Sequence, residues 1–262
     1  MEEWFLLDTG ESSPEYNMAL DESMLYFSYK NKIPILRFYK WSLPTLSIGY
    51  FQKAHETVNF SELSKKGFGF VRRPTGGRAV LHDKEITYSV AAPFKHRLLE
   101  KSIIDSYDLL CKPIVKAFNK LGISAYLSTD NDTEVNSPSC FAAPTLKDIK
   151  VNGKKIVGSA QMRDKRGLLQ HGSILISVNI EDIFTVLKTN VDKNKLISIS
   201  KRKITSLINE GYKENEEKLK EEIIKAFIEI FDINFKAINT PQIGIISEYV
   251  LKYSSNEWNY RI

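Results

Sequence analysis

Hydrophobic and polar positions follow two different periods along the chain, and together they predict a mixture of helices and strands. Residues 102–121 carry apolar side chains at helical spacing, and residues 214–233 carry a second such stripe with acidic residues in its early turns. Pro14 opens another helical stretch that runs to about residue 30. Pro113 lies inside the first of these segments, where we expect it to kink or divide the helix. Shorter helices are predicted over residues 59–67, 180–188 and 241–259.

Strands are predicted where bulky apolar and aromatic residues run between turn residues. Residues 1–9 alternate weakly, which is typical of an edge strand. The dipeptide Asn152-Gly153 separates two strand-like halves and is the strongest short hairpin signal in the chain. Residues 189–203 are polar and basic without clear periodicity, and no element is predicted there. The other predicted strands cover residues 33–41, 43–52, 68–73, 79–93, 123–128 and 168–178. The simplest architecture is one mixed α+β domain, with a small helical part after residue 210.

Composition narrows the class of protein. The chain has 262 residues, 42% of them hydrophobic, which suits a protein with a real core. No run of 18 apolar residues occurs, so a transmembrane helix is excluded, and the acidic N-terminus is no signal peptide. Two cysteines do not make a disulfide framework, so we expect a reducing, cytoplasmic setting. The net charge of +5 permits an acidic partner without demanding one.

Two segments combine glycines with basic residues, and the first is RRPTGGRAVLHD, residues 72–83. Gly76 and Gly77 free the backbone to bend and to approach a ligand closely. Arg72 and Arg73 precede them and could bind a carboxylate or phosphate. The alternative is an ordinary hairpin with arginines facing water. His82 is ambiguous as well, because a lone histidine on a strand is more often structural than catalytic.

The second segment runs from residue 140 to residue 172 and contains Cys140 in a polar, loop-like context. Cys111, by contrast, lies on the apolar stripe of a helix and is expected in the core. A thiolate is a good acyl acceptor, but a free thiol with a pKa near about 8.5 is mostly protonated at neutral pH. A lysine nearby would favour the thiolate, and only one of Lys154 and Lys155 can face it from a strand. The alternative is a basic hairpin with an incidental cysteine.

Small side chains follow the two lysines along the same segment. Gly158, Ser159 and Ala160 would fit the wall of a narrow acyl tunnel, and His171-Gly172 interrupts an otherwise apolar strand. Four histidines and two cysteines at unrelated spacings give no zinc motif, so no metal site is predicted. The sequence also lacks a Gly-x-Ser-x-Gly elbow and a Walker lysine loop.

At these residues the sequence resembles the superfamily of lipoate-protein ligases, biotin ligases and octanoyltransferases. RRPTGGRAVLHDKEITYS is similar to the superfamily's ligand-binding loop, and KIVGSAQMRDKRGLLQHGSIL is similar to its lysine-bearing strand pair. NMALDE, ILRFYKW and LSIGYFQ extend the resemblance over roughly residues 1–250. The cysteine in SPSCF, shortly before the lysine strand, and Arg78 in place of a third glycine are most similar to the octanoyltransferase branch.

The resemblance implies a single mixed-sheet catalytic domain over residues 1–250, with its core at about 30–210 and a C-terminal helical part at 211–262 packed on it. It implies that Cys140 carries an acyl thioester and that Lys155 lowers the pKa of the thiol. The substrate-binding residues it implies are Arg72, Arg73, Thr75, Gly76, Gly77, Ala79, His82, Gly158, Ser159, Ala160, His171 and Gly172.

The activity that the resemblance implies is transfer of octanoyl from octanoyl-acyl carrier protein to a lysine of a lipoyl-accepting protein. Such acceptors include the glycine cleavage H protein and the lipoyl domain of 2-oxoacid dehydrogenase E2. We expect no cofactor, no nucleic acid, no membrane and a monomer. An ATP- and Mg-dependent lipoate ligase would instead use Arg72, Arg73 and Lys155 to hold an acyl-adenylate. An amidotransferase between lipoyl domains and a non-catalytic binding module on the same fold are further alternatives.

Overall fold

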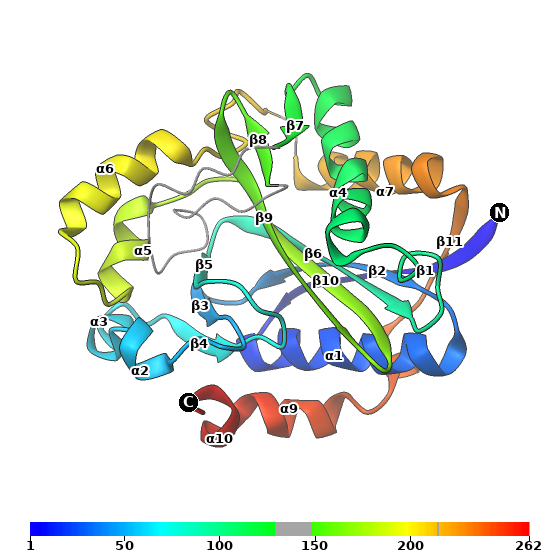
Figure 1. Ribbon diagram of the computed structural model, residues 1–262, viewed down its shortest axis with the longest axis horizontal. Coiled ribbons are helices and arrows are strands. Elements are labelled where there is room, and N and C mark those ends of the chain that lie inside the picture. The colour runs from blue at the N-terminus through cyan, green and yellow to red at the C-terminus, as the bar shows by residue number, and fades with distance from the viewer. Residues whose placement is uncertain (129–147, 214, 262) are drawn as a thin grey trace.

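A mixed sheet of eight strands forms the middle of the molecule, with helices on both of its faces (Figure 1). The structure is a computed structural model, and it describes residues 1–128, 148–213 and 215–261. β1 pairs in parallel with β11 and β2, and the pairs from β2 through β7 are antiparallel. In order across the sheet, the strands are β11 (Ile233–Ala237), β1 (Glu2–Ser12), β2 (Ile35–Trp41), β6 (Glu85–Pro93), β10 (Gly167–Leu175), β9 (Lys154–Asp164), β8 (Ile149–Val151) and β7 (Ala125–Leu127).

Two pairs of helices cover the sheet, and three of the four begin at a proline or a capping residue that the sequence supplies. Ser102 and Asn215 cap α4 and α7 by accepting hydrogen bonds from backbone N–H groups in the first turn. α4 continues past Pro113 without a break, so of the two expected effects of this proline, a kink or a division, the structure excludes the division. Cys111 is buried in the core beneath α4, as the apolar stripe predicted. α4 (Ile103–Lys120) and α7 (Glu216–Phe231) lie on one face, and α1 (Pro14–Asn31) and α9 (Ile246–Ser254) lie on the other (Figure 1).

A second, smaller sheet lies beside the main one and holds the arginine–glycine loop. Its strand order is β4-β3-β5, and the loop from Arg73 to Ala79 joins β4 to β5. Four helices pack around this sheet and form a separate hydrophobic cluster with it. The elements are β4 (Gly69–Arg72), β3 (Thr45–Ile48), β5 (Val80–His82), α2 (Ala54–Thr57), α3 (Phe60–Lys65), α5 (Ile180–Val186) and α6 (Lys193–Lys203).

The structure confirms the predicted α+β class and corrects the predictions for two segments of the chain. β1 is not an edge strand, because residues 233–237 add β11 outside it. Residues 193–203 form α6, whose apolar stripe is too short for periodicity to reveal, since only Leu196 and Ser200 are buried. The short helices α8 (Thr240–Ile243) and α10 (Asn256–Asn259) complete the C-terminal segment. Within the described ranges, every helix is too short or too polar to cross a membrane.

Candidate active site

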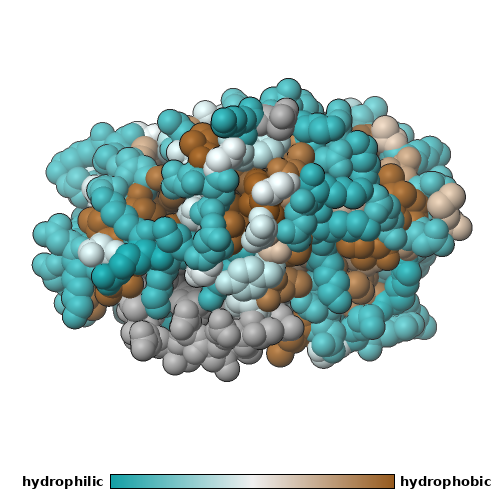
Figure 2. All heavy atoms as spheres, turned by 90° about the horizontal axis from the view of Figure 1, so that it is seen from above, coloured by the Kyte–Doolittle hydropathy of each residue, from teal (hydrophilic) through white to brown (hydrophobic). Residues whose placement is uncertain are grey.

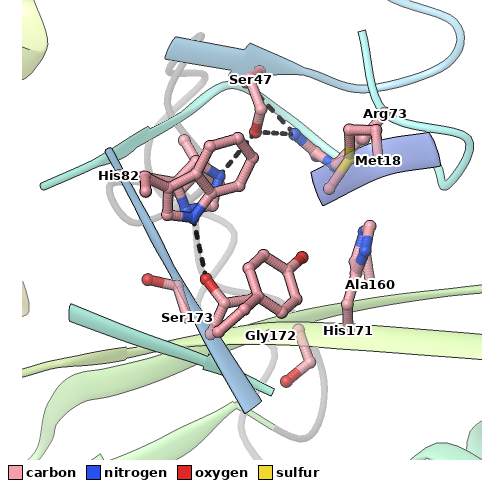
Figure 3. A pocket seen from close by; sticks show the side chains of 14 residues that line it. Met18, Ser47, Arg73, His82, Ala160, His171, Gly172 and Ser173 are labelled. Atoms are coloured by element: carbon pink, nitrogen blue, oxygen red, sulfur yellow. Dashed lines mark hydrogen bonds between the residues drawn. The ribbon is translucent and has the colours of Figure 1, made fainter. Parts of the chain in front are cut away.

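A pocket of about 30 Å³ lies where the small sheet meets β9 and β10 (Figure 3). It brings together the two segments that the sequence singled out, which are far apart along the chain. Its lining among the described residues includes Arg73, His82, Gly158, Ser159, Ala160, His171 and Gly172, all expected from the resemblance. The sequence did not point to the other lining residues, which are Met18, Tyr39, Trp41, Ser47, Val80, Thr87 and Ser173.

Glycines at two positions close to this pocket allow unusually close packing. A Cβ atom on Gly172 would lie 2.3 Å from the Ser159 Oγ and 2.6 Å from a ring carbon of Tyr88. A Cβ on Gly49 would lie 2.0 Å from the carbonyl oxygen of Gly77. Both distances are shorter than any Cβ contact that packing allows, so these positions require glycine. The arginine–glycine loop is thereby held tightly against the end of β3.

Lys155 reaches the interior because of an irregularity in β9. Ile149 pairs with Val157, while its neighbour Lys150 pairs with Lys155, so Ile156 is an extra residue. Ile156 and Val157 then both pack in the same core cluster, and the alternation of side chains reverses between them. We infer that Lys155 lies on the sheet face of Gly158. Its Nζ pairs with the Asp148 carboxylate at 2.9 Å, and both side chains are almost fully buried.

Of the two cysteines, the structure describes Cys111. Cys140 lies outside the described residues, so its geometry relative to Lys155 stays a prediction. Cys111 is buried, and burial raises the pKa of its thiol to about 12. A thiol with so high a pKa is a poor nucleophile at neutral pH. Cys111 is therefore no competitor for acyl transfer.

Two histidines line the pocket, and each is held by a carboxylate. The His82 Nδ1 lies 2.8 Å from the Glu85 Oε1, and its Nε2 lies 2.8 Å from the Ser47 Oγ. The His171 Nδ1 lies 3.0 Å from the Asp21 Oδ2, and its Nε2 lies 2.7 Å from the hydroxyl oxygen, Oγ1, of the loop residue Thr75. Because a carboxylate only accepts hydrogen bonds, each Nδ1 carries the hydrogen and each Nε2 accepts from a hydroxyl when the ring is neutral.

Asp21 is the centre of a buried polar network that the sequence analysis did not identify. It forms an ion pair with Arg37 at 2.8 Å, and both side chains are fully buried. It also accepts hydrogen bonds from Tyr39 and Ser89. Burial by itself would raise the pKa of Asp21, but His171 and Arg37 outweigh that effect, and the pKa ends below its ordinary value. The sequence did contain a sign of this network, because the segments NMALDE and ILRFYKW each place charge within an apolar stretch.

The adjacent arginines of the loop have different partners. The Arg73 side chain donates to Ser47 and to the backbone carbonyls of Gly76 and Arg78, so it shapes the loop beside the pocket. The Arg72 side chain does not line the pocket and instead donates to six backbone carbonyls, those of Gly49, Tyr50, Gln52, Trp258, Asn259 and Arg261. Thr75, Gly76, Gly77 and Ala79 do not line the pocket either, and they belong to the loop that joins β4 to β5.

We expect Arg72→Lys to lower the free energy of unfolding by about 2 kcal/mol, because a lysine cannot replace the guanidinium fork that spans these carbonyls. Urea unfolding of the wild type and the variant measures the difference. Arg202→Lys, at an exposed position of α6, is the control and should unfold like the wild type. Equal stability of Arg72→Lys and Arg202→Lys would contradict this role of Arg72.

Within the described ranges, no three His, Cys, Asp or Glu side chains are grouped to hold a metal ion.

The sequence matches a known protein family and is similar to named proteins over its whole length. Residues 13–228 match the model of the lipoyl protein ligase A/B catalytic domain. The octanoyltransferase LipM of Kyrpidia tusciae is 37% identical over 273 residues and covers 100% of both chains. The octanoyltransferase LipM of Staphylococcus aureus is 34% identical over 278 residues, with 99% of each chain covered.

Solved structures share the same fold over almost the whole chain. A bipartite lipoate protein ligase from Thermoplasma acidophilum superposes with a TM-score of 0.82 at 24% identity, covering 99% of this chain and 97% of the other. A lipoate-protein ligase A bound with ATP gives a TM-score of 0.79 at 26% identity, with 99% of each chain covered. The overall fold is therefore shared with these lipoate-protein ligases.

Proposed function

The chain belongs to the lipoyl protein ligase A/B catalytic domain family and is an acyltransferase of its octanoyltransferase branch, and we propose that it works in two steps through Cys140. The family and branch confirm the resemblance that the motifs indicated. The observation that supports the mechanism most directly is the pocket, which joins the arginine–glycine loop to the small residues that follow Lys155.

In the first step, the Cys140 thiolate attacks the thioester of octanoyl-acyl carrier protein. The C–S bond to the carrier breaks, and the carrier leaves as a thiol after taking up a proton. Exchange of one thioester for another is nearly balanced in free energy, so the enzyme needs no energy input. The octanoyl chain then extends along the wall formed by Gly158, Ala160 and Gly172.

In the second step, a neutral lysine amine of a lipoyl-accepting protein attacks the enzyme thioester. An amide forms, and the Cys140 sulfur leaves. Conversion of a thioester to an amide is downhill, so we propose a reaction that needs neither ATP nor Mg. Splitting the transfer in this way gives ping-pong kinetics.

Lys155 supplies the positive charge for the first step in this proposal. A buried ammonium favours a nearby thiolate and an oxyanion, because both gain a charge that the protein interior solvates poorly. Asp148 holds the Lys155 Nζ in place at 2.9 Å. The Ile156 irregularity in β9 and the bond from the Thr205 N–H to the Lys155 carbonyl fix the backbone on either side.

The surface next to Lys155 suits an acidic partner. α6 presents Lys193, Lys195, Lys201 and Arg202 to solvent, and it ends one residue before Ile204, which pairs with Lys155. Figure 2 shows that hydrophilic side chains dominate the left of the face seen from above, the side on which α6 lies in Figure 1. We propose that acidic carrier and acceptor proteins approach here, with charge acting mainly on the rate of encounter.

Intact mass of the protein after incubation with octanoyl-acyl carrier protein tests the proposal. We expect one octanoyl adduct in the wild type and in Cys111→Ser, and no adduct in Cys140→Ser. Cys111→Ser is the matched control, because it removes the only other cysteine. An adduct that persists in Cys140→Ser would overturn the proposal.

A second arm of the same experiment tests the need for ATP. The preformed octanoyl-enzyme is chased with a lipoyl domain in the absence of nucleotide, and we expect quantitative loss of the adduct with octanoylation of the domain. Free lipoate with ATP and Mg replaces the carrier in a parallel reaction. Modification of the domain only in that parallel reaction would identify a ligase instead.

A further inference from the structure

The two histidines of the pocket have carboxylate partners whose negative charges are stabilised to different extents. Asp21, beside His171, already has its charge matched by the buried guanidinium of Arg37 at 2.8 Å. Glu85, beside His82, is also buried, but its Oε2 has no hydrogen-bond partner among the residues that the structure describes. A buried carboxylate oxygen without a donor is costly, so a nearby group that gains a proton is stabilised by it.

The His82 ring is held rigidly with its second nitrogen toward the pocket. Its Nδ1–H donates to the Glu85 Oε1 at 2.8 Å, and the ring stacks on Trp41 with centroids 4.2 Å apart. The Nε2 accepts from the Ser47 hydroxyl at 2.8 Å, and Ser47 itself lines the pocket (Figure 3). A continuous chain of hydrogen bonds therefore runs from the pocket to a buried carboxylate.

The second step of the proposed function requires a group that accepts a proton. A lysine amine has a pKa near about 10.4 in water, so at neutral pH it is almost entirely an ammonium without a free electron pair. We propose that the Ser47–His82–Glu85 chain is the general base of the transfer step, accepting a proton from the acceptor lysine. The inference rests on the proposed function and names the group that activates its second substrate.

Two protons leave the lysine nitrogen during the transfer, and a C–S bond is exchanged for a C–N bond. One ammonium proton passes to the Ser47 Oγ, while the Ser47 hydroxyl proton passes to the His82 Nε2. The freed nitrogen pair forms the C–N bond, the C–S bond breaks, and its electrons leave on the Cys140 sulfur. The second amine proton ends on that sulfur as the amide forms. His82 is left as an imidazolium beside Glu85 and returns its proton to water.

Two charged groups lie beside the Ser47–His82–Glu85 chain. Glu85 on β6 is in direct contact with the His82 ring at 2.8 Å. The Arg73 guanidinium contacts the other end of the chain, donating to the Ser47 Oγ at 3.1 Å. His171 lies across the pocket, and burial lowers its pKa, which disfavours its protonated form. Both of its nitrogens are also engaged, by Asp21 and Thr75.

A single-turnover experiment on the full chain tests this inference. Octanoyl-enzyme is formed with octanoyl-acyl carrier protein, the carrier is removed, and a lipoyl domain is added over a range of pH. In Glu85→Gln we expect normal thioester formation but transfer about 100-fold slower at neutral pH, the scale of general base catalysis. The deficit should shrink as the pH rises, because the acceptor amine then loses its proton to solvent. Glu62→Gln, which changes a half-buried carboxylate on α3 away from the pocket, is the control with unchanged rates.

His82→Ala provides an independent readout that a structural role would not produce. Free imidazole should restore part of the transfer rate, since removal of the ring leaves a space of its own shape beside Trp41. Wild-type transfer rates with an unchanged pH profile in Glu85→Gln, or a His82→Ala variant that transfers normally without imidazole, would overturn the inference. Absence of any thioester in the wild type is a different failure, which removes the proposed function and this inference with it.

Discussion

Lys155→Ala should slow thioester formation at Cys140 by about 100- to 1000-fold at neutral pH, the scale of losing one electrostatic contact in an active site. Two effects act in the same direction. The variant loses the cation that favours the thiolate, and it leaves the buried Asp148 carboxylate without that cation. Each unit by which the thiol pKa rises lowers the thiolate fraction about tenfold.

The pH dependence of alkylation measures this effect directly. In a Cys111→Ser background, the rate of Cys140 alkylation should rise at higher pH in Lys155→Ala than in the parent. Lys154→Ala is the matched control, because it removes a neighbouring lysine that is only half-buried and lies on the other side of the strand. An alkylation curve for Lys155→Ala that coincides with the parent curve would refute the role of Lys155.

Asp21→Asn should lower the free energy of unfolding by about 3–5 kcal/mol, the cost of leaving a buried charge without its partner. Arg37, which is fully buried, would retain its charge beside a neutral amide. Domains are stable by only about 5–15 kcal/mol, so this one change removes a large share of the total. Urea unfolding at about pH 7 measures the loss.

The pH dependence of stability has a definite sign at this residue. Because the pKa of Asp21 is lowered in the folded protein, its contribution is fully present above the ordinary carboxyl pKa of about 3.9. It is lost as the pH falls through the folded-state value. The wild type should therefore lose stability in acid more steeply than Asp21→Asn. Parallel acid curves would contradict this assignment.

A double variant distinguishes the cost of an unpaired buried charge from the cost of changing the side chains that fill this space. Asp21→Leu with Arg37→Met removes both charges, and it should be more stable than Asp21→Asn because no buried charge is left unpaired. Glu229→Gln, which removes an exposed carboxylate that pairs with Lys116 and Lys120, should unfold like the wild type. If Glu229→Gln were as damaging as Asp21→Asn, burial would not be the cause.

The sequence predicted what depends on local pattern. The α4 stripe, the Asn152-Gly153 hairpin and the core position of Cys111 follow from periodicity and turn chemistry, and the structure contains all three. β11 was missed because a five-residue strand is recognisable only through its parallel partner β1. That partner is more than two hundred residues away in sequence, so no local window contains both.

The part of the candidate site that lies within the sequence motifs was predictable. The two glycine-containing segments meet at one pocket, which fits the resemblance. The Ser47–His82–Glu85 chain joins three strands, and no spacing rule brings a β3 serine to a β5 histidine. The consecutive arginines could not be distinguished either, because only the fold directs Arg72 to residues 258–261 and Arg73 to Ser47. Such assignments depend on tertiary contacts.

The stacking of Trp41 on His82 also has an optical consequence. The chain contains three tryptophans. Trp4 lies in the core beneath α7, and Trp258 lies in the C-terminal segment. Replacing those two with phenylalanine would leave Trp41 as the sole indole, in the wall of the pocket. Its fluorescence would then report the arrival of an acyl chain in real time, without any label attached to either substrate.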